Sequence, residues 1–358
     1  MAVSDKIRWS KKIFLHNGVL PEQVTFFVTN RCNMNCQHCF YRQNLNKANV
    51  EFTLDELKRI IPSLGRFSFL SLTGGEPFLR EDLSEIAGLF VNINKVARIS
   101  IPTNGFFTEK IFDSTRKILK IAGKTKILVK ISIDGIGEKH DNIRAIDGSF
   151  NKDIETFTVL KGLKQKYPNF KLGILLTFSK LNQDTLSDTY TYIKNNLSPD
   201  VVGLNFSRRN FTDSSTNDIN IADYQKLYFQ ILNDLLKEKK NGFGFYEFYS
   251  AYKTKISELV TEIVNTKKYP IDCYAGRLST VIDSSLDVYP CESLDKKLGN
   301  LRDYDYNFRS LWFSDAAEKT REYIADGRCW CTNECNLQIN SFFNINQLLP
   351  LIIRAIMI

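Results

Sequence analysis

The chain is poor in histidine and has no long apolar run. Only three of its 358 residues are histidine, so a metal site built on imidazole ligands is not expected. The longest apolar stretch, LLPLIIRAIMI at the C-terminus, is shorter than the ~18 residues that a membrane span needs, and it contains Pro350 and Arg354. The N-terminal stretch MAVSDKIRWSKKIFLH has early charges and no apolar centre, so we expect no signal peptide. Together these absences favour a cytoplasmic protein without a membrane span.

The positive charge is also not concentrated in blocks. The net charge is +8, which is compatible with a nucleic-acid partner, an acidic protein partner or solubility alone. No run of five or more lysines and arginines occurs. We therefore expect no nucleic-acid partner.

What the chain does have is eight cysteines, three of them in the segment RCNMNCQHCFY at residues 31–41. In a cytoplasmic protein such cysteines indicate metal binding or catalysis more than disulfides. Cys32, Cys36 and Cys39 are close enough to converge on one metal centre, and cysteine thiolates are the usual ligands of iron–sulfur clusters. Three ligands leave one metal position open, which is typical of a catalytic site. The alternative is a structural zinc site completed by His38 or by a remote cysteine.

Residues 21–207 alternate between strand-like and helix-like patterns. Thr53 and Glu56 form a capping box at the start of the first expected helix. Six strand–helix units predict an α/β fold with a parallel sheet, and six are fewer than the eight of a closed barrel, so we expect an open or partial barrel. The expected strands are 23–30, 67–72, 97–101, 127–133, 171–177 and 201–206, and the expected helices are 52–64, 81–91, 108–122, 150–166 and 182–196.

The pattern changes after residue 207. Two helices are expected at 221–240 and 248–266, followed by a cysteine-bearing segment of short strands and turns at 273–335. The apolar tail is expected to dock on the core, with contact to a lipid or a partner as the alternative. The expected division is an N-terminal extension (1–20), a core (21–210), a helical linker (211–270), a cysteine-rich region (271–340) and the tail (341–358).

Polar and glycine residues close successive strands of the expected sheet. The second strand ends in SLTGGEPF, the third in IPTNG and the fourth in ISIDG. Ligands bind at the C-terminal ends of parallel strands. Gly74 and Gly75 would let the backbone approach a ligand closely, and Glu76 would present a carboxylate suited to an ammonium group. Each segment alone could be a simple turn.

Together, three motifs resemble those of the radical S-adenosyl-L-methionine (SAM) enzymes. They are the cysteine loop after the first strand, GGEP after the second and SIDG…HDNIR (132–144) after the fourth. More narrowly, they resemble the branch with a SPASM or twitch extension. The resemblance implies a partial (β/α)6 radical SAM barrel with a C-terminal cysteine-rich extension. It also implies a [4Fe–4S] cluster held by Cys32, Cys36 and Cys39, whose open iron is chelated by the amine and carboxylate of SAM.

The same resemblance implies roles for individual residues. Glu76 would bind the SAM amino group, and Ser132 and Arg144 would reach its carboxylate or ribose. For Arg144 a surface salt bridge is an alternative, and His140 and Asp141 could simply brace a loop. The other implied cofactor-binding residues are His38, Phe40 and Tyr41 beside the adenine, Gly74, Gly75, Pro77, Asn104 and Asp134, with Thr177 and Asn205 as weaker candidates.

The remaining five cysteines are similar to a SPASM/twitch region. CYAGRLSTVIDSSLDVYPC matches its opening, except that Leu286 stands where the family usually has glycine, so the turn must form differently. Five thiols fit one auxiliary [4Fe–4S] cluster with one cysteine left over. We expect Cys273 and Cys291 to be ligands, together with two of the three cysteines Cys329, Cys331 and Cys335. A structural zinc site on four of these thiols is the alternative.

The resemblance implies an oxidoreductase or related radical-transfer enzyme. Reductive cleavage of SAM would give a 5′-deoxyadenosyl radical that abstracts hydrogen from a substrate C–H bond, with a flavodoxin or ferredoxin as reductant. Only 31 residues precede Cys32, and this together with the cysteine count favours a small metabolite of the sugar or cyclitol type over a ribosomally made peptide. A non-catalytic iron–sulfur or zinc protein that binds nucleic acid is a further, less favoured alternative.

Overall fold

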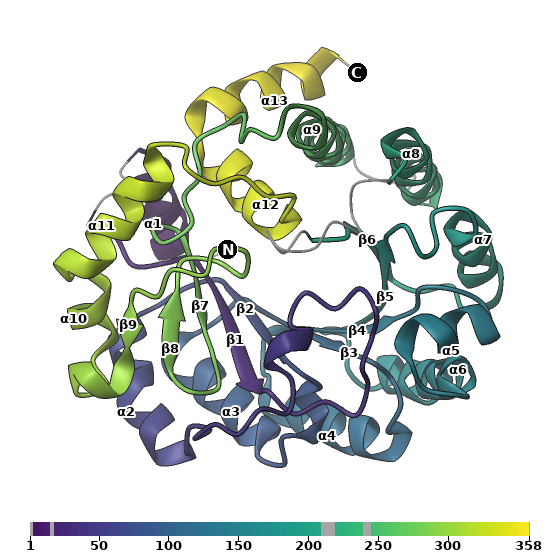
Figure 1. The fold of residues 1–358 in the computed structure, drawn as a ribbon, viewed down its shortest axis with the longest axis horizontal. Helices are drawn as coiled ribbons and strands as arrows, with labels where there is room; N and C mark the ends of the chain where they lie inside the picture. Colours follow the sequence, from purple (N-terminus) through teal and green to yellow (C-terminus); the bar gives the residue numbers. More distant parts are fainter. Residues whose placement is uncertain (1–2, 15–17, 209–218, 239–244, 358) are drawn as a thin grey trace.

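The computed structural model describes residues 3–14, 18–208, 219–238 and 245–357, and it shows helices arranged around a curved β-sheet (Figure 1). The first part of the sheet has six parallel strands in the order β6-β5-β4-β3-β2-β1. This arrangement confirms the expected α/β partial barrel. The strands are β1 (Gln23–Thr29), β2 (Phe69–Gly74), β3 (Arg98–Thr103), β4 (Lys126–Ser132), β5 (Phe170–Phe178) and β6 (Val201–Phe206).

Helices connect these strands and cover the outer side of the sheet (Figure 1). The expected capping box is present in α2, where the Thr53 hydroxyl accepts from Glu56 N and the Glu56 carboxylate accepts from Thr53 N. The helices of this part are α2 (Leu54–Leu64), α3 (Leu83–Leu89), α4 (Thr108–Ile121), α5 (Glu138–Arg144), α6 (Ser149–Lys161), α7 (Leu186–Asn196), α8 (Ile221–Glu238) and α9 (Phe245–Thr266).

The cysteine-rich region continues the same sheet. Strand β7 (Ser279–Ile282) pairs in parallel with β1, and β8 (Asp287–Tyr289) and β9 (Gly299–Asn300) follow in antiparallel order, giving a nine-stranded sheet. The edge of β1 would otherwise present unpaired backbone N–H and C=O groups. The C-terminal region therefore shares its backbone hydrogen bonds with the barrel.

Alternation along the strands decides which residues point inward. In β4, Ile127, Val129 and Ile131 are fully buried, whereas Lys130 and Ser132 are only partly buried. Successive side chains of a strand point to opposite faces. The apolar set packs against the covering helices, and the other set faces the interior of the barrel.

Several elements differ from the sequence-based expectation. Helix α1 (Val3–Phe14) was not expected. It is held by the buried carboxylate of Glu22, which lies 2.6 Å from Lys12 Nζ and 2.9 Å from Arg8 Nη2. The segment HDNIR is helical (α5). The end of the helix expected at 221–240 falls at residues 239–240, outside the described residues.

The region expected to hold only short strands and turns also contains helices, α10 (Phe308–Trp312) and α11 (Asp315–Ala325). The apolar tail consists of the end of α12 (Glu334–Phe343) and α13 (Ile345–Met357), which packs on α9 and α12 and buries Leu351. It therefore docks on the rest of the chain, as expected. No helix in the described ranges is long and apolar enough to cross a membrane.

Candidate active site

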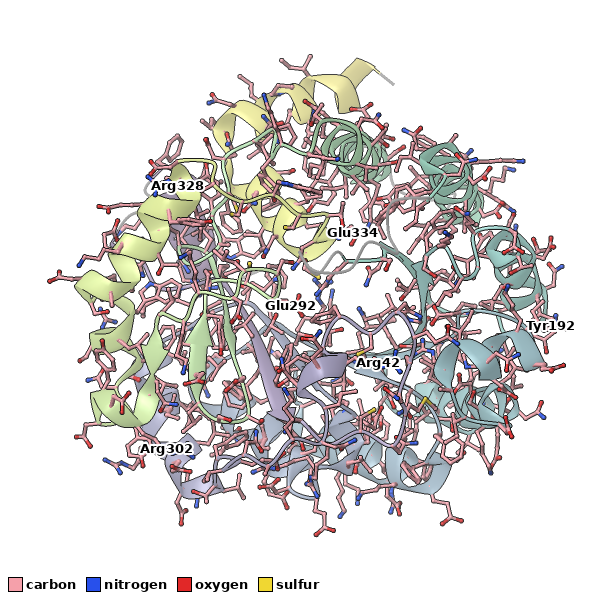
Figure 2. All side chains as sticks on the ribbon, in the orientation of Figure 1. Arg42, Tyr192, Glu292, Arg302, Arg328 and Glu334 are labelled. Carbon is pink, nitrogen blue, oxygen red and sulfur yellow. The ribbon has the colours of Figure 1, made fainter. Side chains whose placement is uncertain are left out.

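A cavity of about 490 Å³ occupies the interior of the barrel. Its walls come from the inner faces of the parallel strands, from α8 and α9, and from the start of α12. Glu292 and Glu334 lie toward the centre of the molecule in Figure 2, whereas Arg302 and Arg328 lie at its periphery. The loop that carries Cys32, Cys36 and Cys39 closes the cavity at the C-terminal end of β1, as the resemblance implied.

The three-cysteine loop (residues 31–41) is held by hydrogen bonds to its backbone. Cys32 N donates to the side-chain oxygen of Asn46 at 3.0 Å, and Asn46 Nδ2 donates back to Cys32 O at 3.0 Å. Donors also point at the sulfurs. Asn104 Nδ2 lies 3.9 Å from Cys32 Sγ, and Arg144 Nη1 lies 3.7 Å from Cys36 Sγ. Such donors stabilise thiolates and the net negative charge of an iron–sulfur cluster.

Glu76 presents a buried carboxylate beside this loop. Its side chain accepts hydrogen bonds from Phe78 N (3.1 Å), Thr103 Oγ1 (2.9 Å) and Asn104 N (2.7 Å). Burial nevertheless raises the pKa of Glu76 to about 7, because none of these donors carries a full charge. A cationic ligand would supply the missing compensation, so the site suits an ammonium group.

Arg144 forms a buried ion pair and not the surface salt bridge that was the alternative. Its Nη2 lies 2.5 Å from the Asp134 carboxylate, which also lies 3.3 Å from His38 Nε2. Burial opposes ionisation of Asp134, but Arg144 and His38 outweigh it and lower the pKa of this carboxyl. Asp134 also accepts from Thr177 N at 2.7 Å. The pair ties the end of β4 to α5 and places Arg144 beside Cys36.

The glycines of GGEP are required for a reason that the sequence did not reveal. A Cβ on Gly74 would lie 2.1 Å from Thr29 O, and one on Gly75 would lie 2.1 Å from Arg31 O. Gly74 also has a φ of +132°, which side chains rarely adopt. The close approach is thus to the backbone that leads into the three-cysteine loop, in addition to any approach to a ligand.

Most of the residues expected to bind SAM line the cavity, and two do not. Pro77 starts a 3-10 turn and is buried behind the wall, and Asp134 is buried behind Arg144 and His38, so neither is placed for direct contact. The expected residues that do line the cavity are His38, Phe40, Tyr41, Gly74, Gly75, Glu76, Asn104, Ser132, Arg144, Thr177 and Asn205.

The alternative roles considered for His140 and Asp141 match the structure. His140 Nδ1 accepts from Asp134 N at 3.1 Å, and its Nε2 lies 3.1 Å from the Asp153 carboxyl. Asp141 accepts from Gly148 N and Phe150 N, both at 2.8 Å. Both side chains therefore brace the connection between β4 and α6.

The five C-terminal cysteines divide into two groups. Cys273, Cys291, Cys329 and Cys331 surround one small cavity of about 20 Å³, together with Tyr269 and Trp330. Cys335 lies apart from them, because it starts α12 and faces the large cavity. The structure thereby favours Cys329 and Cys331, of the last three cysteines, as companions of Cys273 and Cys291.

The turn at Leu286 forms with an unusual backbone. Leu286 adopts a φ of +67° at the position where the family usually has glycine, and its side chain is fully buried. The Asp283 carboxylate accepts from Ser285 N and Asp287 N, both at 2.9 Å, and thereby closes the turn. The sequence predicted only that this turn forms without glycine, and the structure shows that the Asp283 side chain holds it.

Charged residues that sequence reasoning missed also line the large cavity. The most prominent are Arg98, Lys130, Arg208 and Lys253. The sequence did contain a pattern that predicts such residues. In KILVKIS, Lys130 and Ser132 are two positions apart and therefore lie on the same face of the strand, which is the face of the polar strand end.

The residues present fit the two groups that the resemblance implies. Burial raises the pKa of Cys32 to about 12 and of Cys39 to about 11, which suits thiols that are deprotonated only when they bind metal. His38 Nδ1 and Arg144 Nε are buried without a hydrogen-bond partner among the described residues. A ligand in the cavity could supply such partners.

Nowhere in the described ranges do three His, Cys, Asp or Glu side chains lie close enough to hold a single metal ion. A [4Fe–4S] cluster binds each thiolate at a different iron, so its ligands stand farther apart than those of one ion.

The chain is similar to several known proteins. Residues 26–193 match the model of the Radical SAM superfamily. The chain is 26% identical over 302 residues to the AdoMet-dependent heme synthase of Methanosarcina barkeri. The aligned residues cover 82% of this chain and 82% of that protein. It is 26% identical over 328 residues to the antilisterial bacteriocin subtilosin biosynthesis protein AlbA of Bacillus subtilis, covering 88% of this chain and 66% of that protein. The crystal structure of Streptococcus suis SuiB bound to S-adenosylmethionine has a TM-score of 0.58 at 16% identity, covering 89% of this chain and 72% of that one, so the two share a fold.

The chain is therefore a radical SAM enzyme. The similarity to AlbA over 88% of the chain and the C-terminal cysteines agree with the SPASM/twitch branch that the sequence resembles. Enzymes of this family use a [4Fe–4S] cluster and SAM, which confirms the cofactors expected from the sequence.

Proposed function

We propose that the protein uses SAM to abstract a hydrogen atom from a C–H bond of a small metabolite held in the large cavity. The observation that carries this proposal is that Cys32, Cys36, Cys39 and Glu76 open into the same 490 Å³ chamber as the inner strand faces. This volume is typical of sites for small molecules, and SAM must share it.

Each residue has a distinct part in this proposal. The three thiols of the loop hold the cluster, and Glu76 accepts a hydrogen bond from the SAM amino group. Arg144 and Asn104 stabilise the negative charge of the cluster through their contacts with Cys36 and Cys32. The cluster and SAM supply the chemistry, which is one-electron cleavage of SAM to methionine and a 5′-deoxyadenosyl radical. The barrel walls position the substrate C–H bond and exclude water.

The four thiols Cys273, Cys291, Cys329 and Cys331 fit an auxiliary [4Fe–4S] cluster in the C-terminal region. Because β7 pairs with β1, this region is fixed relative to the barrel. An auxiliary cluster here would accept the electron from a substrate radical, so the net reaction would be an oxidation. Flavodoxin or ferredoxin is the proposed source of electrons for both clusters.

The proposal is tested by anaerobic reconstitution with iron and sulfide, followed by SAM and dithionite. We expect 5′-deoxyadenosine and methionine to form, and deuterium from a deuterated metabolite pool to appear in the 5′-deoxyadenosine. Absence of SAM cleavage by protein that holds its clusters would contradict the proposal.

Modification of a ribosomally made peptide is the second candidate, supported by the similarity to AlbA over 88% of the chain. A parallel experiment with a peptide pool separates the two. Deuterium transfer from the peptide pool alone would favour this candidate over the small metabolite.

A further inference from the structure

Three cationic side chains inside the large cavity lack an acidic partner. Arg98, Lys130 and Lys253 all line the cavity, and none of their side chains forms an ion pair or a hydrogen bond with any residue that the structure describes. Two of them lie near aromatic rings: Arg98 is 5.0 Å from the centre of the Phe69 ring, and Lys253 is 5.8 Å from that of Tyr249. Arg98 is exposed and Lys130 and Lys253 are half-buried, so all three cations are accessible to a ligand that enters the cavity.

The three cations come from different elements and converge on one region. Arg98 begins β3, Lys130 lies on the neighbouring strand β4, and Lys253 lies on α9. Burial lowers the pKa of Lys130; the nearby charges of Arg98, Lys253 and Arg208 lower it further, and the Cys335 thiol opposes the shift. The fold thus gathers like charges at a cost, and a bound anion would remove that cost.

The acidic groups of the cavity do not offset these charges. Glu292 is engaged by Arg208, at 2.5 Å, and by Asn333 Nδ2, at 3.1 Å. Glu334 accepts from Phe206 N at 2.6 Å, and burial raises its pKa to about 7, so much of it is neutral near neutral pH. Glu76 belongs to the end of the cavity beside the three-cysteine loop. The region around Lys130 therefore carries net positive charge.

Arg98 lies far along its strand from the Glu76 end of the cavity, whereas Lys130 pairs with Pro102 and lies nearer to that end. Strand β3 runs from Arg98 to Thr103, whose hydroxyl donates to Glu76. At about 3.3 Å per residue, the two ends of this strand lie roughly 16 Å apart. A molecule anchored by Arg98 and Lys130 would extend toward the three-cysteine loop.

We propose that Arg98, Lys130 and Lys253 form a binding site for the anionic groups, carboxylate or phosphate, of the substrate. This proposal rests on the proposed function. It adds that the substrate has a charged end and a reactive end. The anionic end sits among the three cations, while the C–H bond to be attacked points toward the three-cysteine loop and Glu76. The substrate is accordingly an acidic metabolite and not a neutral sugar.

The test measures anion binding by the reconstituted full chain without SAM or reductant, using calorimetry. The carboxylate probe is tricarballylate and the phosphate probe is glucose 1,6-bisphosphate, so the two arms distinguish the two chemistries. The variants are Lys130→Gln and Arg98→Gln, with Lys130→Arg as the charge-conserving form. Lys117→Gln, on the exposed face of α4, is the matched control.

We expect saturable binding of at least one probe that weakens as salt is raised. Lys130→Gln and Arg98→Gln should each weaken it about tenfold or more, because each removes a charge-assisted hydrogen bond. Lys130→Arg and Lys117→Gln should retain it, and cluster content and thermal unfolding of each variant report whether it has folded.

Binding of neither probe to the wild-type chain, or equal binding by folded Lys130→Gln and Arg98→Gln variants, would overturn the site. These outcomes are independent of SAM cleavage. If the wild-type chain cleaves SAM but binds neither probe, the anion site is refuted and the proposed function stands. If it binds a probe but does not cleave SAM, the proposed function is refuted.

Discussion

Replacement of Glu76 by glutamine gives the sharpest test of the SAM end of the cavity. The change removes the carboxylate charge and with it a charge-assisted hydrogen bond to the SAM ammonium group. Such bonds contribute about 1.5–3 kcal/mol, so the Kd for SAM should rise roughly ten- to hundredfold. SAM affinity is measured anaerobically on reconstituted protein by equilibrium dialysis.

The pH dependence of SAM binding follows from the same residue. Burial raises the pKa of Glu76 to about 7, so the carboxyl is mostly protonated at pH 6 and mostly ionised at pH 8. Only the ionised form makes a charge-assisted hydrogen bond to the SAM amino group. SAM binding should therefore tighten as pH rises, by about tenfold between pH 6 and pH 8, and this dependence should disappear in the Glu76→Gln variant.

A matched control separates this effect from general damage to the cavity. Glu334 is also a buried carboxyl of the same cavity with a pKa raised to about 7, but it lies at the start of α12. Glu334→Gln should retain both the SAM affinity and its pH dependence.

In the wild-type chain Asn104 N donates a hydrogen bond to the Glu76 carboxylate at 2.7 Å, and the Glu76→Gln change places an amide beside this donor. Thermal unfolding is therefore measured alongside binding. A folded Glu76→Gln variant that binds SAM as tightly as the wild type would refute the role of Glu76.

Three further predictions concern the clusters, the unusual turn and the reductant. Cys331→Ser should reduce the iron content from about two [4Fe–4S] clusters to about one, whereas Cys335→Ser should leave it unchanged; equal iron loss in both would contradict the grouping of the thiols. Leu286→Gly should relieve about 1–2 kcal/mol of backbone strain but lose about 2–5 kcal/mol of core packing, so urea unfolding should show net destabilisation of about 0–4 kcal/mol, and a more stable variant would be inconsistent with this balance. Cluster reduction by flavodoxin should slow as salt is raised, because the basic surface would steer an acidic partner. Reduction by dithionite should be unaffected by Lys or Arg replacements around the three-cysteine loop. A flavodoxin rate that does not depend on salt would argue against this role of the basic surface.

The sequence by itself determined the barrel, and it predicted the residues that we propose bind the cluster and SAM. The six strands and most of their helices follow from local periodicity, which is set by the burial of one face of each element. The three cysteines lie within eight residues, so their convergence needs no long-range information. Glu76 directly follows a strand, and the C-terminal ends of parallel strands meet at one edge of a sheet.

Only the tertiary structure decided the rest, because it depends on contacts between residues far apart in the chain. Cys329 and Cys331 approach Cys273 and Cys291, while Cys335, four residues later, turns into the other cavity. Likewise, α9 brings Lys253 to the same chamber as the strand that carries Lys130. Local patterns specify which face of an element is buried, but the packing of the elements decides which side chains meet.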